Sequence, residues 1–180
     1  MKKLMYIFTL ITVTLIAVLS FARSSDITHV IAREHPTDNQ LQALVDGYSE
    51  REIKGTDASI TSDALLVYEG ETVTSHALDD DLFFVSFAPY VDTTHPCEIH
   101  SLSGCQGELA HEDVNVTIET PDGKVLFEDT INTGTNGFID LWVTRGQEYK
   151  IHLQYKDKQV RQSFTSFADS PTCITTMQLH

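Results

Sequence analysis

The sequence predicts a mainly β protein of the α+β class, in which a short N-terminal helical segment precedes an antiparallel β-sandwich. Three observations predict this fold. Short runs that alternate apolar and polar side chains recur from Ala64 onward, among them DVNVTIET and EYKIHLQYK. Turn-forming residues separate these runs, a combination typical of an antiparallel sandwich. Ahead of the runs, one segment repeats its apolar residues at helical spacing instead.

The helix is predicted from about Asp38 to Arg51. Thr37 and Gln40 match the T-x-x-Q capping box that marks a helix N-terminus. Apolar residues follow at the spacing of one helix face: Leu41, Leu44, Val45 and Tyr48. The next stretch, KGTDASITSD, is polar and is predicted to be a connector. The apolar face of the helix could also serve a homodimer.

The strands are predicted from Ala64 to the C-terminus. ALLVYEG and ETVTSHAL form an expected pair, and DLFFVSFAPYV an apolar strand. DVNVTIET and KVLFEDTI form a hairpin turned at Pro121–Gly123, since Pro-Asp-Gly between alternating runs is a turn signal. A second hairpin is expected from GFIDLWVT and EYKIHLQYK, turned at Arg145–Gln147, followed by strands QVRQSFTSF and TCITTMQL. The run from Asp122 to Tyr155 resembles small transthyretin-like or Cna-B-like sandwiches, a resemblance of fold alone.

The first 22 residues have the layout of a secretory signal peptide. Two lysines precede a long apolar run, and SFA ends in a small-x-small pattern that predicts cleavage after Ala22. No cysteine lies near this point, which excludes a lipoprotein anchor. An uncleaved membrane anchor is the alternative, because the run is near the lower length limit for spanning a bilayer. The expected organisation is residues 1–22 as signal peptide, 23–63 as N-terminal helical segment and 64–180 as β-sandwich.

The charge balance excludes some classes of partner. The chain has 26 acidic and 12 basic residues, a formal net charge of −14. Removing the signal peptide deletes Lys2 and Lys3 and no acid, which leaves 12 − 2 = 10 bases and a net charge of 10 − 26 = −16. Such a surface repels nucleic acid and anionic membranes. Motifs of hydrolases and nucleotide-binding proteins (GxSxG, HExxH, a glycine-rich phosphate loop) are absent from the sequence, as is CxxC.

The stretch HPCEIHSLSGCQGE contains two of the three cysteines, Cys97 and Cys105. His95 precedes a proline, which favours an extended conformation in which His95 and Cys97 face the same point. Gly104 allows the backbone to turn back just before Cys105. His100 lies inside the loop and is a further candidate ligand. The loop can therefore bring both sulfurs close to each other or to one ion.

Three interpretations of the cysteines remain open on the residues alone. In an oxidising compartment two nearby cysteines form a disulfide by default. That pairing leaves Cys173 as an odd thiol, which needs an explanation in an exported protein. Three thiolates suit Cu(I), a soft ion, and three cysteines with one histidine suit Zn(II). Met177 is too far along its predicted strand to share an ion with Cys173, and we expect it in the core.

The signal peptide, the block THPCEIHSLSGCQGEL, the β-rich remainder and the terminal SPTC together resemble the CueP family of periplasmic copper-binding proteins. The resemblance covers most of the mature chain, and the cysteine-containing block is its most specific part. It implies copper resistance in the periplasm, with copper held as Cu(I) by three cysteines that fall on Cys97, Cys105 and Cys173. It also implies copper supply to a periplasmic copper/zinc superoxide dismutase and a capacity to reduce Cu(II). His95 and His100 are additional candidate contacts of the metal.

We therefore expect a copper-binding protein that sequesters or delivers the ion and has no membrane attachment after signal cleavage. A second hypothesis is a redox enzyme, in which Cys97 and Cys105 give two electrons to Cu(II) and become a disulfide. The third is a disulfide-stabilised β-sandwich that binds a partner protein and has no metal role.

Overall fold

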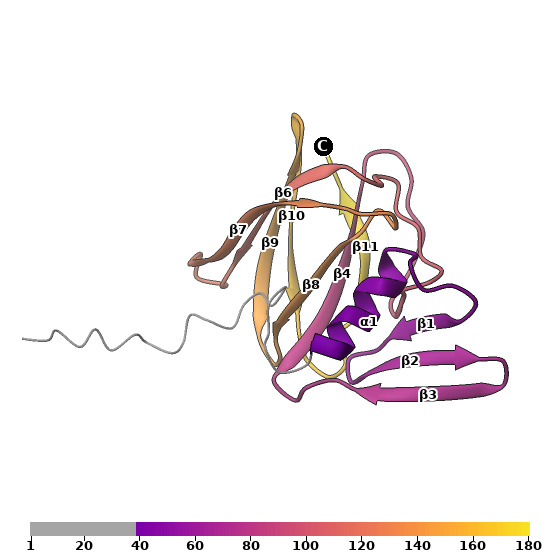
Figure 1. The fold of residues 1–180 in the computed structure, drawn as a ribbon. Helices are drawn as coiled ribbons and strands as arrows, with labels where there is room; N and C mark the ends of the chain where they lie inside the picture. The colour runs from indigo at the N-terminus through magenta and orange to yellow at the C-terminus, as the bar shows by residue number, and fades with distance from the viewer. Residues whose placement is uncertain (1–38) are drawn as a thin grey trace, which may run out of the picture.

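The computed structural model describes residues 39–180 and shows a mainly β protein (Figure 1). The expected signal peptide and the capping residue Thr37 lie outside the described residues. The described elements are one helix and eleven strands: α1 (Asn39–Ser49), β1 (Asp57–Ile60), β2 (Ala64–Glu69), β3 (Thr72–Ala77), β4 (Leu82–Tyr90), β5 (His100–Ser101), β6 (Asp113–Glu119), β7 (Val125–Asn132), β8 (Ile139–Thr144), β9 (Glu148–Tyr155), β10 (Lys158–Thr165) and β11 (Cys173–Gln178). The predicted fold class is confirmed.

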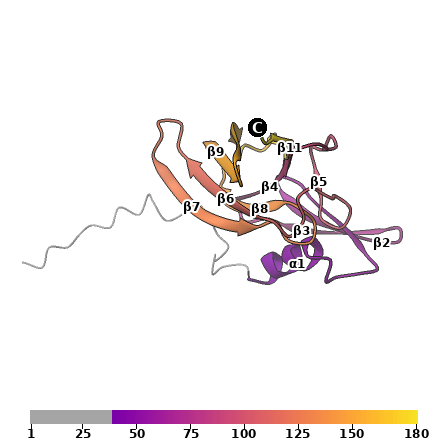
Figure 2. The same cartoon turned by 90° about the horizontal axis from the view of Figure 1, so that it is seen from above.

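The strands form three sheets. The N-terminal sheet has the order β3-β2-β1-β5, the central sheet β11-β4-β8 and the outer sheet β10-β9-β6-β7. Neighbouring strands are antiparallel except β11, which runs parallel to β4. Seen from above, β4 and β8 lie between α1 and β9 (Figure 2). The central sheet is therefore covered on both faces.

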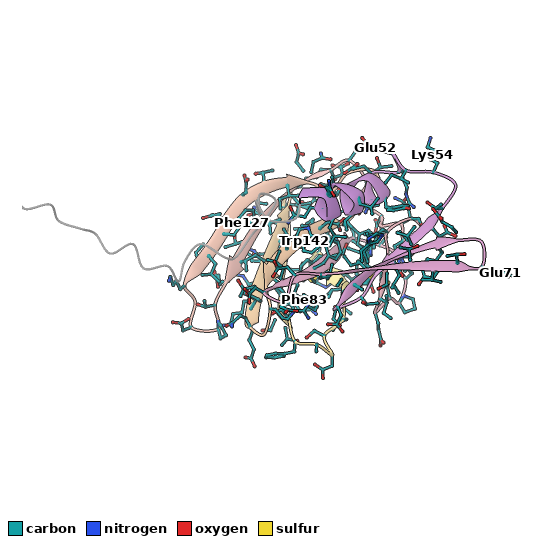
Figure 3. All side chains as sticks on the ribbon, turned by 60° about the horizontal axis from the view of Figure 1, so that its bottom comes forward. Glu52, Lys54, Glu71, Phe83, Phe127 and Trp142 are labelled. Carbon is teal, nitrogen blue, oxygen red and sulfur yellow. The ribbon has the colours of Figure 1, made fainter. Side chains whose placement is uncertain are left out.

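The position of β4 explains its continuous apolar sequence. Phe83 and Phe87 are fully buried in the core shared with the outer sheet. Phe84 points the other way, into the core shared with α1 and the N-terminal sheet, where its ring lies 5.2 Å from that of Trp142. Figure 3 shows Trp142 among the side chains beneath α1. A strand buried on both faces has no need for alternating polar residues.

The helix begins and ends close to the predicted bounds. Leu41, Val45 and Tyr48 are buried in the core, as their spacing predicts. The helix ends at Ser49, two residues before the predicted end. Arg51 has a φ of 62°, a left-handed conformation that cannot continue a right-handed helix. No helix within residues 39–180 is long and apolar enough to cross a bilayer.

The first predicted hairpin is confirmed. β6 and β7 pair from Asp113↔Asn132 to Glu119↔Val125, with the turn between them. The N–H of Gly123 donates to the carbonyl of Thr120 at 2.9 Å. Gly123 has a φ of 89°, which its lack of a Cβ permits.

The second predicted hairpin is wrong. β8 pairs with β4 in the central sheet, whereas β9 pairs with β6 and β10 in the outer sheet. The turn at Arg145–Gln147 therefore carries the chain from one sheet to the other. The physical reason is that β8 buries both of its faces: Trp142 enters the core beneath α1, while Leu141 and Val143 enter the core shared with the outer sheet.

The polar segment predicted to be a connector contains β1. This strand pairs with β2 and, through Ile60↔His100, with the short strand β5. Ala58 and Ile60 are buried, but a four-residue strand gives too short an alternation to stand out in the sequence. The division into segments at residue 64 stays a prediction, with β1 on its N-terminal side. The pairing matters for the site, because it fixes the backbone of His100.

Candidate metal centre

The cysteine-containing loop runs from the end of β4 to the start of β6 and is closed at its base by Glu108. The Glu108 carboxylate accepts hydrogen bonds from the backbone N–H groups of Val91, Asp92 and Thr93 at 2.9–3.0 Å. Burial is the largest single influence and opposes ionisation, but the three hydrogen bonds together outweigh it and lower the pKa of Glu108. The two ends of the loop are thereby held together.

A close approach of two glycines holds the far side of the loop. The N–H of Gly107 donates to the carbonyl of Asn136 at 2.7 Å. A Cβ at Gly107 would lie 2.3 Å from the carbonyl oxygen of Gly137, a distance that no side chain allows. The loop is consequently packed against the segment that leads into β8, and this segment carries Phe138.

His100 is fully buried and its backbone is fixed by two neighbours. Its N–H donates to the hydroxyl of Thr172 at 3.1 Å, and that hydroxyl donates to the carbonyl of Ile60 at 2.6 Å. The imidazole ring lies 4.6 Å from the ring of Phe138 and 6.2 Å from that of Phe84. The β1–β5 pairing and the aromatic contacts together leave the ring little freedom.

Cys173 begins β11 and is 1% exposed. Its N–H donates to the carbonyl of Glu98 at 3.1 Å, which joins the loop to the last strand. Cys105 is held by its own N–H, which donates to the Ser101 carbonyl at 2.9 Å, and by Arg51, which donates to the Cys105 carbonyl at 2.7 Å. The final strand thus passes beside the loop, as the copper hypothesis requires.

Four potential ligand atoms meet here. They come from Cys97, His100, Cys105 and Cys173, and all lie within 4.8 Å of one another. The Sγ atoms of Cys97 and Cys105 are 3.6 Å apart, and Nδ1 of His100 is 3.4 Å from Sγ of Cys173. Within residues 39–180, no other group of three or more histidine, cysteine or acidic side chains has this geometry.

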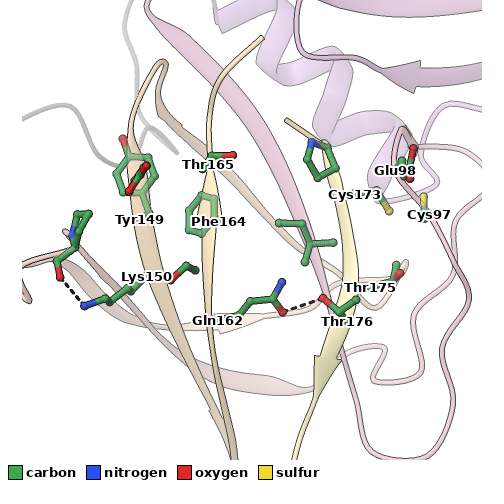
Figure 4. Close-up of a pocket in the computed structure, with 15 residues that line it drawn as sticks. Cys97, Glu98, Tyr149, Lys150, Gln162, Phe164, Thr165, Cys173, Thr175 and Thr176 are labelled. Atoms are coloured by element: carbon green, nitrogen blue, oxygen red, sulfur yellow. Dashed lines mark hydrogen bonds between the residues drawn. The ribbon is translucent and has the colours of Figure 1, made fainter. Parts of the chain in front are cut away.

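These distances fit a shared ion. Two sulfurs at about 2.3 Å from one tetrahedral ion lie about 3.8 Å apart. The separation of 3.6 Å is also too long for an S–S bond of about 2.05 Å, and all three cysteines are free thiols. Figure 4 shows Cys97 and Cys173 side by side near the start of β11. A groove of about 420 Å³ between β10 and β11 reaches both residues.

The pKa values of Cys105 and Cys173 are shifted in opposite directions. A hydrogen bond from Cys173 is the main cause of a lowered pKa at Cys105, and although burial opposes it, bonds from His100 and His95 add to it. The same bond to Cys105, together with burial, raises the pKa of Cys173 far above the usual range. These opposite shifts favour the thiolate form at Cys105 and the thiol form at Cys173.

His100 completes the charge arrangement. Burial lowers its pKa, but hydrogen bonds to the Cys105 and Cys97 sulfurs outweigh burial and raise it to about 9. The negative charge of Asp140 adds to this rise. An imidazolium thus lies beside a thiolate, and the imidazolium must lose a proton before it can bind an ion, since metal ligands bind in deprotonated form.

The structure brings four of the five predicted site residues together. His95 lies outside the group of four ligand atoms, with its ring 6.2 Å from that of Phe138. The segment around His95 is irregular, so the two-residue period of a strand does not apply to it. Met177 is fully buried in the core, as expected. Sequence reasoning missed Ser86 and Asp140, which lie behind the His100 ring.

The fold and the site define a small β-sandwich protein with a partly buried cluster of three thiol groups and one imidazole that could hold a metal ion. The family described as periplasmic copper-binding protein CueP matches residues 40–178, and the chain belongs to this family. A solved structure titled "Crystal Structure of S.CueP" is similar to this chain, with 33% sequence identity and a TM-score of 0.75. The match covers 80% of this chain and 91% of the chain in that structure. No curated protein matches the chain. The resemblance noted in the sequence is confirmed, and the family is one of periplasmic copper-binding proteins.

Proposed function

We propose that this protein holds Cu(I) in the periplasm through the thiolates of Cys97, Cys105 and Cys173 and thereby supports copper tolerance. The observation that carries the proposal is the convergence of three free sulfurs and one imidazole nitrogen within 4.8 Å. Soft thiolate ligands favour Cu(I), an ion that accepts low coordination numbers. His100 supplies a fourth contact. Zn(II) would fit the same four atoms, and membership of a copper-binding family favours copper.

The exposure of the ligands suits loading and release. Cys97 and Cys105 are partly exposed, whereas His100 and Cys173 are buried. An ion therefore meets the outer pair of sulfurs first and completes its coordination on the inner pair of ligands. His95, partly exposed and hydrogen-bonded to Cys105, serves as an outer contact for the incoming ion. A recipient protein would displace the outer sulfurs first.

We propose a periplasmic copper/zinc superoxide dismutase as the recipient of the copper, as the family resemblance implies. We also propose that the protein forms a homodimer, the oligomer that the sequence of the N-terminal helix suggested. Transfer is tested by incubating the Cu(I)-loaded protein with metal-free dismutase and measuring the activity gained. The oligomeric state is measured by light scattering of the mature chain with and without copper.

Reduction of Cu(II) is a second candidate activity, favoured by the 3.6 Å separation of the Cys97 and Cys105 sulfurs. In the balanced reaction, two Cu(II) ions each gain one electron. The two thiols lose two electrons and two protons and form one disulfide. The sulfurs need to approach by about 1.5 Å to reach S–S bonding distance. Reduction consumes two of the three thiolates that binding needs, so a reductant must restore them before Cu(I) is held again.

The decisive experiment measures metal content and thiol state on the same sample. Fully reduced protein is titrated with Cu(I) without oxygen, in competition with a Cu(I) chelator, and its thiols are counted before loading and after the metal is removed. We expect one tightly held Cu(I) and three thiols at both points. Competition by excess Zn(II) should leave Cu(I) in place. A protein that contains one free thiol as isolated from its own compartment, and that releases Cu(I) to a weak chelator after reduction, would instead be the disulfide-stabilised module.

A further inference from the structure

We propose that Ser86 and Asp140 are positioning residues that hold the His100 ring with Nδ1 toward the sulfurs, an inference that rests on the proposed copper site. Neither residue is a ligand. Ser86 lies on β4 and is fully buried, and Asp140 lies on β8 directly opposite it in the ladder. Together they form the layer of the molecule behind the imidazole.

The contacts form a chain that leads away from the metal centre. On one side of the ring, Nδ1 lies 3.4 Å from the Cys173 sulfur. On the other side, Nε2 lies 3.4 Å from the hydroxyl of Ser86. That hydroxyl donates to Oδ1 of Asp140 at 2.5 Å, and the second oxygen of Asp140 accepts from the hydroxyl of Ser49 at 2.7 Å. Each atom of the chain therefore has a defined partner.

The direction of these bonds fixes which ring nitrogen carries a proton. The Ser86 hydroxyl has one hydrogen, and the carboxylate of Asp140 takes it because an ionised carboxylate only accepts. The oxygen of Ser86 can then only accept from His100, so Nε2 must carry a hydrogen. In the neutral ring that a metal ion requires, Nδ1 is left as the nitrogen that can offer its lone pair to the ion. This is the carboxylate–histidine–metal arrangement of many metal sites, with a serine inserted between carboxylate and ring.

The apolar neighbours of the ring cannot do the same. Phe138 and Phe84 lie 4.6 Å and 6.2 Å from the imidazole ring and limit its plane, but as apolar rings they offer neither nitrogen a strong hydrogen-bond acceptor. A ring turned by half a revolution would move Nδ1 away from the Cys173 sulfur and Nε2 away from the Ser86 hydroxyl. It would also leave a buried N–H without an acceptor, which is unfavourable. The polar chain thus selects one of the two ring orientations through hydrogen bonds that the apolar neighbours do not supply.

The chain is anchored outside the sheet. Ser49 is the last residue of α1 and is 5% exposed, and it donates to the carboxylate oxygen of Asp140 that Ser86 does not use. Both carboxylate oxygens are therefore engaged, and the carboxylate cannot rotate away from Ser86 without breaking a bond. The helix consequently contributes to the metal centre without supplying a ligand.

The test is a double-mutant cycle on Cu(I) affinity with Ser86→Ala, His100→Ala and the double variant, measured by competition with a Cu(I) chelator. Loss of a residue that orients a metal ligand typically weakens metal binding about 10- to 100-fold. We expect this loss for Ser86→Ala and no further loss when Ser86→Ala is added to His100→Ala. Ser166→Ala is the matched control: this equally buried serine follows β10, its hydroxyl accepts from the N–H of Gln147 in the turn between β8 and β9, and its loss should leave affinity unchanged.

A spectroscopic readout separates positioning from a structural role. In the Cu(I)-loaded protein, the ¹⁵N spectrum of His100 should show a slowly exchanging proton on Nε2. Ser86→Ala and, as a second variant, Asp140→Ala should lose that protection, while circular dichroism shows the sandwich still folded. Equal losses of affinity in the wild-type and His100→Ala backgrounds would overturn the inference.

The proposed copper site can fail separately. If His100→Ala binds Cu(I) as tightly as the wild type, His100 is not a ligand and the positioning role is wrong, while the three-thiolate site stands. If the reduced wild-type protein does not compete with the chelator, or Cys173→Ser leaves affinity unchanged, the copper site itself is wrong. The two failures are read from different variants.

Discussion

The Sγ atoms of Cys97 and Cys105 lie 3.6 Å apart across the loop that links β4 to β6. This separation is compatible with two chemical states. With an ion between them the sulfurs are already at the spacing of two ligands, and without an ion a small shift joins them in a disulfide. The same pair can therefore bind a metal or give up electrons, depending on what reaches it.

The first prediction concerns reduction of copper by this pair. Adding excess Cu(II) to the fully reduced protein without oxygen should produce two Cu(I) ions and consume two thiols per chain, because one disulfide supplies two electrons. A Cu(I)-specific indicator and a thiol count on the same sample measure the two quantities. Peptide mapping should place the new disulfide between Cys97 and Cys105.

Cys105→Ser is the control for this reaction, because it keeps Cys97 and Cys173 but removes the partner at 3.6 Å. It should yield far less Cu(I) at early times. If wild type and Cys105→Ser reduce Cu(II) equally, or if Cu(II) binds without any indicator signal, the reductase hypothesis is wrong.

Much of this site could be predicted from sequence because its core is local. Cys97, His100 and Cys105 fall within nine residues, and the turn residue Gly104 lies between the two cysteines. Cys173 is 68 residues beyond Cys105 (173 − 105 = 68), and only the need to explain an odd thiol, with the family resemblance, connected it to the loop. Its actual place depends on β11 running parallel to β4, a pairing that no local pattern encodes.

The residues behind the site could not be predicted in the same way. Asp140 is one of 26 acidic residues, and nothing in its neighbourhood marks it as different. Ser86 gave a faint signal, as a serine inside the apolar run of β4. The expected hairpin of β8 with β9 also prevented prediction of the contact between Ser86 and Asp140. These two residues face each other only when β8 pairs with β4.

The second prediction concerns thiol reactivity in the metal-free protein. The lowered pKa of Cys105 keeps it a thiolate at pH values where an ordinary cysteine, with a pKa of about 8.5, is protonated. Cys173 is buried and its pKa is raised, so it should react last. Brief alkylation at mildly acidic pH, followed by peptide mass spectrometry, should label Cys105 first and Cys173 least. Preferential labelling of Cys173 would contradict the electrostatic arrangement described here, and bound Cu(I) should protect all three.

The third prediction concerns the base of the loop. Glu108→Gln exchanges one acceptor oxygen for an N–H₂ group that faces backbone N–H donors, so we expect it to lower the free energy of unfolding by about 1 kcal/mol at neutral pH, a value reduced for solvent screening. The folded-state pKa of Glu108 is depressed, so its contribution is present above the unfolded value of about 4.3 and is lost as pH falls through the folded pKa.

Urea unfolding at neutral pH and near pH 3 measures this dependence, with the wild type and the variant compared at each. The difference between them should shrink in acid. The exposed Glu71 at the tip of the β2–β3 hairpin, labelled in Figure 3, provides the control, since Glu71→Gln should change stability little at either pH. A constant difference across pH would show that the carboxylate charge does not hold the loop.

The last prediction separates a copper site from a plain disulfide protein. Cys173→Ser should weaken Cu(I) affinity by orders of magnitude, because a hard hydroxyl is a poor ligand for a soft ion, while the similar size of serine preserves the packing of this buried position. Cys97→Ser and Cys105→Ser should weaken affinity comparably. A disulfide-stabilised module would behave in the opposite way: it would be indifferent to Cys173→Ser and would lose about 2–4 kcal/mol of stability on Cys97→Ser. Competition titrations with a Cu(I) chelator and urea unfolding of the three reduced variants give both quantities. Unchanged affinity in Cys173→Ser would rule out the three-thiolate site.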